Sequence, residues 1–229
     1  MKAIANPGTR GPLRLAVLIS GRGSNMAAIA HACLAGQIAA QPVVVISDRG
    51  DAHGLAAAAA LGLATVVLEP AQFENRAQFE AALAQAIDAS RAGLVVLAGF
   101  MRILSSAFVE RYAGRLLNIH PSLLPEFKGL DTHRRVLQAG GREHGASVHF
   151  VTAELDGGPV ICQARVPVRV DDNEQSLAAR VLLEEHRIYP KVIGLIASGR
   201  LALRGATVML DGRALAQPLL EQQSHVAPA

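Results

Sequence analysis

Asn118 and His120 are the residue pair in this sequence best suited to chemistry. They lie near the end of an apolar run, residues 116–120, that predicts a β-strand. Side chains two residues apart in a strand point to the same face, so this amide and this imidazole should project together. An amide donor beside an imidazole suits a carbonyl whose oxygen becomes negative during acyl transfer. The alternative is a structural histidine, which is the commoner use of a single His.

Asp156 is a third candidate, because a carboxylate beside His120 would favour the protonated imidazolium. The residue precedes two glycines and a proline, which is equally typical of a simple turn. Asp156 and His120 lie far apart along the chain, so the sequence leaves both interpretations open.

A glycine-rich segment, residues 20–25 (SGRGSN), falls between an apolar run and an Ala-rich run. Backbone N–H groups at the start of a helix attract anions, most often phosphate. The segment does not match a Walker A loop, and the third glycine of the dinucleotide fingerprint would fall on Met26. We therefore expect a small phosphorylated ligand here, with a simple tight turn as the alternative.

The elements that must hold these residues follow from the alternation of short β-branched runs with Ala- and Leu-rich runs in the first half of the chain. The expected strands are residues 13–20, 42–47, 65–68 and 94–98. The expected helices are residues 26–34, residues 55–61 and a helix capped by Asn75 that runs to about Ala89. This pattern predicts an α/β protein with a parallel sheet and helices on both faces. Such sheets bind ligands beyond the carboxyl ends of their strands.

The second half of the chain has a more mixed pattern. The expected strands are residues 116–120, 143–151 and 159–168. Asn173 is the expected N-cap of a long helix that ends at Gly199. A hairpin of residues 207–210 and 213–216, turning at Asp211-Gly212, should follow, and the chain should fray from Gln217.

The composition narrows the classes of function. The chain has 229 residues, of which 51% are hydrophobic and 18% charged, and this excludes a disordered protein. Aromatic residues make up 3%, without Trp, and the 22 Lys and Arg residues are dispersed, giving a net charge of +3. Both features argue against a nucleic-acid partner. We therefore expect small-molecule substrates.

Cys33 and Cys162 are far apart and lack the spacing of a disulfide framework or zinc site. We therefore expect no bound metal and a reducing compartment. The apolar residues 52–68 rely on Ala, and residues 15–20 lead into glycines without a cleavage pattern, so we expect neither a membrane span nor a signal peptide. The protein should be cytoplasmic, as a monomer or homodimer.

Five separated motifs together resemble the folate-dependent formyltransferase family, in the family's order. They are SGRGSN at residues 20–25, LAGFMRIL at 97–104, NIHPSLLP at 118–125, GASVHFV at 145–151 and LDGG at 155–158. The resemblance implies a formyltransferase-type Rossmann-like sheet, parallel in its N-terminal half and mixed or antiparallel in its C-terminal part. It also implies formyl transfer from 10-formyltetrahydrofolate to the amine of phosphoribosylglycinamide in purine synthesis, without a metal.

The same resemblance implies one domain, residues 13–216. Residues 13–112 would be the nucleotide-binding half, and residues 113–216 the catalytic and folate-binding half. Residues 1–12 and 217–229 would be flexible termini.

Individual roles are implied residue by residue. The family's catalytic residues match Asn118, His120 and Asp156. The nucleotide-binding positions are Gly23, Ser24, Asn25 and Glu185. The folate-binding positions are Arg76, Met101, Arg102, Ile103, Leu104, Asn118, Thr152, Ala153, Glu154, Leu155 and Asp156. The sequence departs from the family pattern at Lys128, Asp131 and Ala153, which bears on folate affinity and loop order.

Related functions are the alternatives. A methionyl-tRNA formyltransferase would normally continue into an RNA-binding domain, and a formyltetrahydrofolate hydrolase would carry an N-terminal regulatory domain. A non-catalytic phosphate-binding module would need none of the Asn/His/Asp set. A cis peptide at Leu124-Pro125 is possible, and His149 is either a site residue or structural. The other histidines are expected to be exposed or to serve packing: His31, His53 and His225, with His133 on a solvated basic face.

Overall fold

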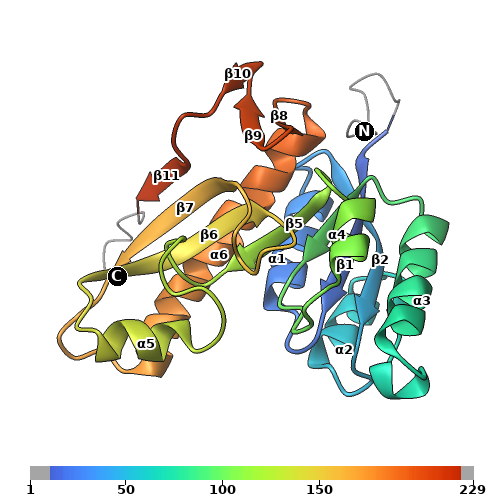
Figure 1. Cartoon of the computed structure of the whole chain (residues 1–229), viewed down its shortest axis with the longest axis horizontal. Coiled ribbons are helices and arrows are strands. Elements are labelled where there is room, and N and C mark those ends of the chain that lie inside the picture. The colour runs from blue at the N-terminus through green and yellow to red at the C-terminus, as the bar shows by residue number, and fades with distance from the viewer. Residues whose placement is uncertain (1–10, 223–229) are drawn as a thin grey trace.

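The first five strands form the parallel part of one large sheet in this computed structural model, which describes residues 11–222 (Figure 1). Helices connect these strands along the chain. The strands are β1 (Leu13–Ile19), β2 (Ala40–Ser47), β3 (Thr65–Val67), β4 (Leu94–Leu97) and β5 (Leu116–His120). The helices are α1 (Ser24–Leu34), α2 (His53–Ala60), the 3-10 helix η1 (Pro70–Gln72), α3 (Arg76–Ala89) and α4 (Ser106–Arg111). All neighbouring pairs among these strands are parallel, as predicted.

Both faces of this parallel part are covered, which explains why its strands are continuously apolar. In β1, Leu15, Val17 and Ile19 join a core formed with α1, α2 and the long C-terminal helix α6 (Glu174–Ala197). The alternate residues Ala16 and Leu18 join a second core under α3 and α4. The expected helices on both faces are therefore confirmed.

The remaining strands make the sheet mixed. They are β6 (Glu143–Phe150), antiparallel to β5, β7 (Val160–Pro167), antiparallel to β6, and β11 (Leu219–Gln222), parallel to β7. The full order is β11-β7-β6-β5-β4-β1-β2-β3. A short helix, α5 (Thr132–Gln138), lies between β5 and β6 in the chain.

Strand β11 corrects the expectation that the chain frays from Gln217. Residues 219–222 pair with residues 162–165 of β7, and this long-range pairing has no local signal. The expected flexibility of residues 1–10 and 223–229 lies outside the described residues.

The predicted helix caps are confirmed. The Asn75 side chain accepts a hydrogen bond from Gln78 N, and the Asn173 side chain accepts one from Ser176 N within a capping box. Beyond α6, a small separate sheet contains the expected hairpin. Its strands are β8 (Leu201–Arg204), β9 (Thr207–Leu210) and β10 (Arg213–Ala214).

The strand order reverses between β1 and β4, which lie side by side although two strands separate them in the chain. Loops at such a reversal leave in opposite directions and open a crevice at the carboxyl edge of the sheet. Here the loop after β1 is joined to the loop after β4, because Ser20 N donates to Gly99 O (3.1 Å) and Met101 N to Ser20 Oγ (2.8 Å). Strand β5 adjoins β4, so all three loops meet at one edge.

Candidate active site

His120 ends β5 with its imidazole buried between two oxygen acceptors. Its Nε2 lies 3.0 Å from Phe127 O, and its Nδ1 lies 3.5 Å from Asp156 Oδ2. A carbonyl can only accept, so Nε2 carries a proton, while Nδ1 faces the Asp156 carboxylate. This geometry brings the predicted pair His120 and Asp156 together.

Asp156 reaches His120 because the loop between β6 and β7 returns tightly. The loop closes where Phe150 N donates to Pro159 O (3.1 Å), and a Cβ at Gly158 would lie 1.8 Å from Phe150 O. Asp156 itself has φ 48°, and its Oδ2 accepts from Gly129 N at 2.9 Å. The two glycines that suggested a simple turn thus allow the turn to carry the carboxylate inward.

His149 belongs to this cluster, which the sequence left open. In the β5–β6 register His149 is paired with Asn118, and Asn118 Nδ2 lies 3.1 Å from His149 Nε2. His149 Nδ1 lies 3.0 Å from Phe150 O, so Nδ1 is the protonated nitrogen and Nε2 accepts from the amide. Burial lowers the pKa of His149, which keeps the ring neutral. The neutral ring orients the Asn118 amide with its NH₂ group toward β6.

Ser147, which the sequence did not single out, anchors the loop that follows His120. The hydroxyl is buried, donates to Ser122 O (2.6 Å) and accepts from Leu124 N (3.0 Å) and Gln163 Nε2 (2.9 Å). The Leu124–Pro125 peptide within this loop is cis. The signal available in the sequence was the alternation of β6, which places Ser147 and His149 on one face.

The glycine-rich segment leads directly into α1 at the carboxyl end of β1. Gly23 is the N-cap with φ 73° and has no side chain to cap the first turn, so the N–H groups of that turn can receive an anion. Gly54 of α2 packs against this segment, since its N donates to Gly21 O (2.9 Å). A Cβ at Gly23 would lie 2.7 Å from Gly54 Cα, so both positions require glycine.

Asn25 and Glu185, predicted separately for nucleotide binding, are in direct contact. Asn25 Nδ2 donates to Glu185 Oε2 at 2.6 Å, which joins α1 to α6. Burial raises the pKa of the Glu185 carboxyl, while the hydrogen bond from Asn25 and the nearby charge of Arg22 act in the opposite direction. A buried, hydrogen-bonded carboxylate here is suited to hydroxyl groups of a ligand.

The predicted folate positions gather around the loop after β4. Arg76 Nη2 donates to Ile103 O (2.6 Å), and Arg102 Nε donates to Asp48 Oδ2 (2.7 Å). The Met101 and Ile103 side chains are 66% and 70% exposed. Exposed apolar side chains beside Arg76 fit a flat apolar ring system with an anionic tail. Leu104 is half-buried and packs on the core under α3.

The second predicted folate segment, residues 152–156, lies on the other side of His120. Thr152 Oγ1 donates to Glu154 O (3.5 Å), and Leu155 is 51% exposed. Two departures from the family pattern form ion pairs. Lys128 Nζ contacts Glu154 Oε1 at 2.6 Å, and Asp131 pairs with Arg134. The third, Ala153, is exposed. Lys128 therefore ties the loop after β5 to the loop that carries Asp156.

His133 corrects the expectation of a solvated basic face. Its Nδ1 lies 3.0 Å from Nε2 of the fully buried His144, and burial lowers the pKa of both rings, that of His144 to about 4. His31 and His53 are exposed, as expected, and His225 lies outside the described residues.

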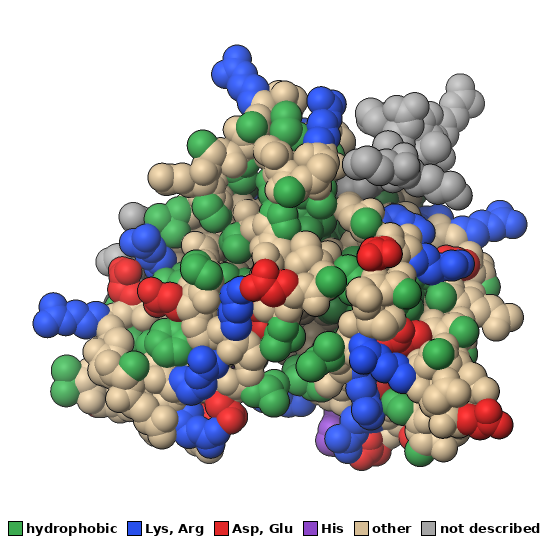
Figure 2. Space-filling model, viewed as in Figure 1, with side chains coloured by type: hydrophobic (Ala, Val, Ile, Leu, Met, Phe, Trp, Pro, Cys, Tyr) green, Lys and Arg blue, Asp and Glu red, His purple; other side chains and the backbone are tan. Residues whose placement is uncertain are grey.

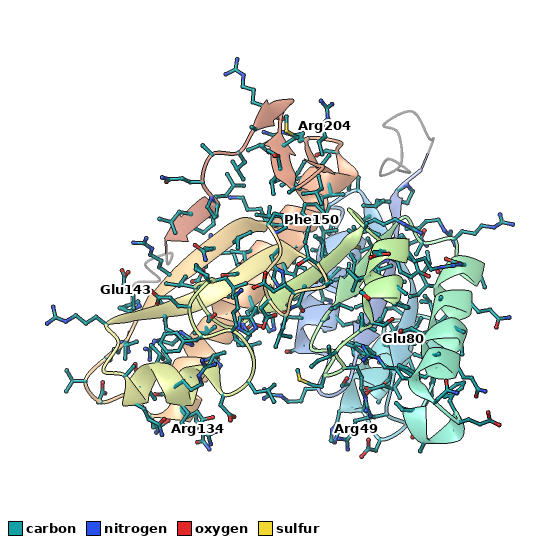
Figure 3. All side chains as sticks on the ribbon, in the orientation of Figure 1. Arg49, Glu80, Arg134, Glu143, Phe150 and Arg204 are labelled. Atoms are coloured by element: carbon teal, nitrogen blue, oxygen red, sulfur yellow. The ribbon has the colours of Figure 1, made fainter. Side chains whose placement is uncertain are left out.

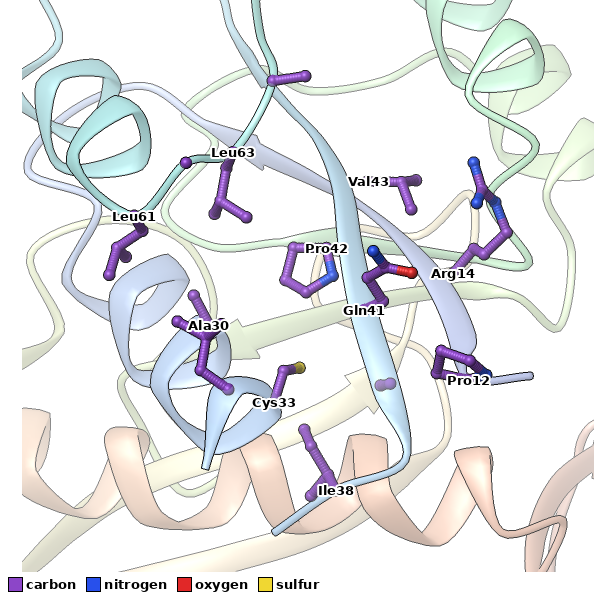
Figure 4. Close-up of a pocket in the computed structure, with 14 residues that line it drawn as sticks. Pro12, Arg14, Ala30, Cys33, Ile38, Gln41, Pro42, Val43, Leu61 and Leu63 are labelled. Atoms are coloured by element: carbon purple, nitrogen blue, oxygen red, sulfur yellow. The ribbon is translucent and has the colours of Figure 1, made fainter. Parts of the chain in front are cut away.

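A cavity of the described residues lies away from this cluster. This cavity, of about 800 Å³ at the amino ends of β1 and β2, is lined by Arg14, Cys33, Gln41 and Leu63, among others (Figure 4). It lies opposite to the carboxyl edge where ligands of parallel sheets bind. Lys and Arg side chains are interspersed with Asp and Glu over the face in Figure 2.

Among residues 11–222, no group of three or more His, Cys, Asp and Glu side chains is placed to hold a metal ion. No helix described there is both long and apolar enough to cross a membrane.

Known proteins resemble this chain in both sequence and fold. The Formyl transferase family matches residues 13–193. The chain is 52% identical over 203 residues to the phosphoribosylglycinamide formyltransferase of Escherichia coli (strain K12), covering 89% of this chain and 96% of the relative. It is 43% identical to that of Haemophilus influenzae, covering 88% and 95%. The solved phosphoribosylglycinamide formyltransferase of Coxiella burnetii superposes with a TM-score of 0.88 at 47% identity, covering 91% and 99%.

Proposed function

The chain belongs to the formyl transferase family, among its phosphoribosylglycinamide formyltransferases, and we propose that it works by direct attack of the substrate amine on the formyl carbon of 10-formyltetrahydrofolate. The observation that carries this proposal is the buried His120 ring, which is bonded at Nε2 to Phe127 O and faces Asp156 at Nδ1, with Asn118 oriented by a neutral His149. The folate supplies the one-carbon unit. The chain's own residues supply orientation, charge and proton transfer.

Asn118 and His120 stabilise the negative charge that develops on the formyl oxygen. One Asn118 Nδ2 hydrogen is committed to His149, which leaves the other to donate to that oxygen. His120 Nε2–H is committed to Phe127 O, whereas Nδ1 lies 3.5 Å from Asp156, beyond a strong hydrogen bond. Nδ1–H is therefore the second donor to the developing oxyanion.

Asp156 lies beside His120 and serves as the proton carrier. Its Oδ2 accepts from Gly129 N and faces His120, while Oδ1 lies 3.8 Å from His149 Nε2. A carboxylate held in this way can take the proton of the attacking amine and return it, through water, to the departing nitrogen. The side chain of Asp156 is 9% exposed, so bulk water has little access to it.

Binding of both substrates uses the edges of the same crevice. The first turn of α1 at Gly23, Ser24 and Asn25 holds the phosphate, and Glu185 holds the ribose hydroxyls. Arg76 and the exposed apolar side chains after β4 hold the folate. Side-by-side binding supplies rate through proximity. Both cysteines are free, which fits a reducing cytoplasm.

The test is to follow tetrahydrofolate formation by ultraviolet absorbance with 10-formyltetrahydrofolate and purified protein. Release that requires added phosphoribosylglycinamide is expected. Release without the amine would instead identify a hydrolase. Folate binding with no release under either condition would identify a binding module and contradict the proposal.

A further inference from the structure

The loop between β5 and α5 has two backbone groups that contact His120 and Asp156. Phe127 O accepts from His120 Nε2 (3.0 Å), and Gly129 N donates to Asp156 Oδ2 (2.9 Å). The carbonyls of Lys128 and Leu130, in the same loop, instead accept hydrogen bonds from a side chain of α5. Two catalytic side chains are therefore positioned by main-chain atoms of one short segment, residues 127–131.

Arg135 of α5 holds the other side of this segment. Its Nη1 donates to Lys128 O (2.6 Å) and Leu130 O (3.3 Å), and its guanidinium carbon lies 5.5 Å from the centre of the Phe127 ring. Side chains of a helix lean toward its N-terminus, which brings Arg135 over the segment that precedes α5. One side chain thus contacts three of the five residues in the segment.

Two residues of the segment have unfavourable backbone conformations. Phe127 and Asp131 have φ angles of 52° and 57°, in the left-handed region that residues other than glycine rarely adopt. Such conformations persist when surrounding contacts over-determine them. Arg135 donates to the carbonyls of Lys128 and Leu130, which are sequence neighbours of Phe127 and Gly129. Phe127 O contacts His120, and Gly129 N contacts Asp156.

We propose that Arg135 is a positioning residue, which holds residues 127–131 so that Phe127 O and Gly129 N align His120 and Asp156 for the reaction. This inference rests on the proposed roles of His120 and Asp156. Arg135 itself is exposed and contacts neither of them through its side chain. Its contribution should therefore appear in turnover and not in substrate binding.

The experiment compares kcat and KM of three variants of the full chain. Arg135→Ala should lower kcat about tenfold to hundredfold, with both KM values within about twofold, because a misplacement of about 1 Å can cost about a hundredfold in rate. Arg135→Lys keeps a cation that can donate to both carbonyls and should recover most of kcat. Arg204→Ala is the control, since Arg204 is an exposed arginine of β8 that lies away from α5 (Figure 3).

Hydrogen exchange supplies an independent readout. Amides of residues 127–131 should exchange faster in Arg135→Ala, while those of β8 stay unchanged. Wild-type kcat in Arg135→Ala, an equal loss in Arg204→Ala, or a change confined to KM would each overturn the inference. If His120→Ala is inactive while Arg135→Ala behaves as wild type, only this inference fails. Wild-type turnover in His120→Ala would remove the proposed function instead.

Discussion

The two halves of the sheet build their parts of the candidate site by different means. In the parallel half, the proposed phosphate site is one continuous segment, residues 20–25. This segment connects β1 to α1, so its backbone N–H groups lie at the start of the helix. In the mixed half, taken from β5 onward, the proposed catalytic set assembles from three separate segments: residues 118–120, 127–129 and 149–156. The proposed phosphate contact is thus local in sequence, whereas the proposed catalytic set depends on tertiary contacts.

The difference has a simple geometric origin. A parallel strand–helix turn always places the first turn of its helix at the carboxyl edge, whatever happens elsewhere. An antiparallel pair places two side chains together only in one register, and a shift by one residue would turn His149 to the other face. We therefore expect variants in the mixed half to lower kcat, and variants in the parallel half to raise KM.

The largest effect is expected at His120. His120→Ala removes one of two donors to the developing oxyanion and should lower kcat about 10³-fold, with KM little changed. Asp156→Asn keeps an acceptor for Gly129 N but removes the carboxylate proposed to take the amine proton, and should lower kcat about 10²-fold. Steady-state kinetics with circular dichroism checks both. A rise in KM at unchanged kcat would break the division between the halves.

The next effect is expected at Gly54, where local propensity and tertiary packing disagree. Ala is the better helix former by about 1 kcal/mol, which alone predicts a more stable α2. The added Cβ would lie 2.6 Å from Ile19 Cδ1 and 3.0 Å from Gly21 O, so overpacking should cost about 1–3 kcal/mol. Displacing the proposed phosphate-binding segment should raise the KM of the nucleotide about tenfold.

Ala56→Gly is the matched control for that substitution, because residue 56 lies on the exposed side of the same helix. It should lower the free energy of unfolding by about 1 kcal/mol without changing KM. Urea unfolding and steady-state kinetics measure both quantities. A Gly54→Ala protein that is more stable and has the wild-type KM would show that the contact between α2 and the glycine-rich segment is unimportant.

The smallest effect concerns Glu185, which links the two halves through Asn25. Burial raises the pKa of this carboxyl in the folded protein above its ordinary 4.5, so its stabilising contribution is complete below pH 4.5 and is lost as pH rises through the raised pKa. Glu185→Gln should therefore match the wild type at pH 4.5 and become relatively more stable as pH increases. The difference should grow by about 1.4 kcal/mol for each unit by which the pKa is raised.

Urea unfolding at several pH values between 4.5 and 8 measures this difference. The same variant should bind the nucleotide more weakly at pH 7, because it lacks the carboxylate proposed to meet the ribose hydroxyls. A stability difference that is constant with pH would contradict the burial of a charged Glu185. An unchanged KM would remove Glu185 from the nucleotide site.

Much of the fold could be predicted because its signals are local. Buried strands such as β1 are apolar on both faces, and caps such as Asn75 and Asn173 mark helix starts by residue type. Strand β11 could not be predicted, since its partner β7 lies more than fifty residues earlier and pairing leaves no local pattern. The burial of His133 against His144 was missed for the same reason.

By itself, the sequence determined the fold class, the family and the residue types available for reaction, because periodicity, capping and motif order are written along the chain. Only the tertiary structure decided which of these residues work together. The β5–β6 register pairs His149 with Asn118. The tight turn at Gly158 brings Asp156 to His120. Arg135 donates a hydrogen bond to the loop that contacts both His120 and Asp156. Side-chain convergence depends on strand register and loop closure, which are set by the balance of contacts across the whole molecule.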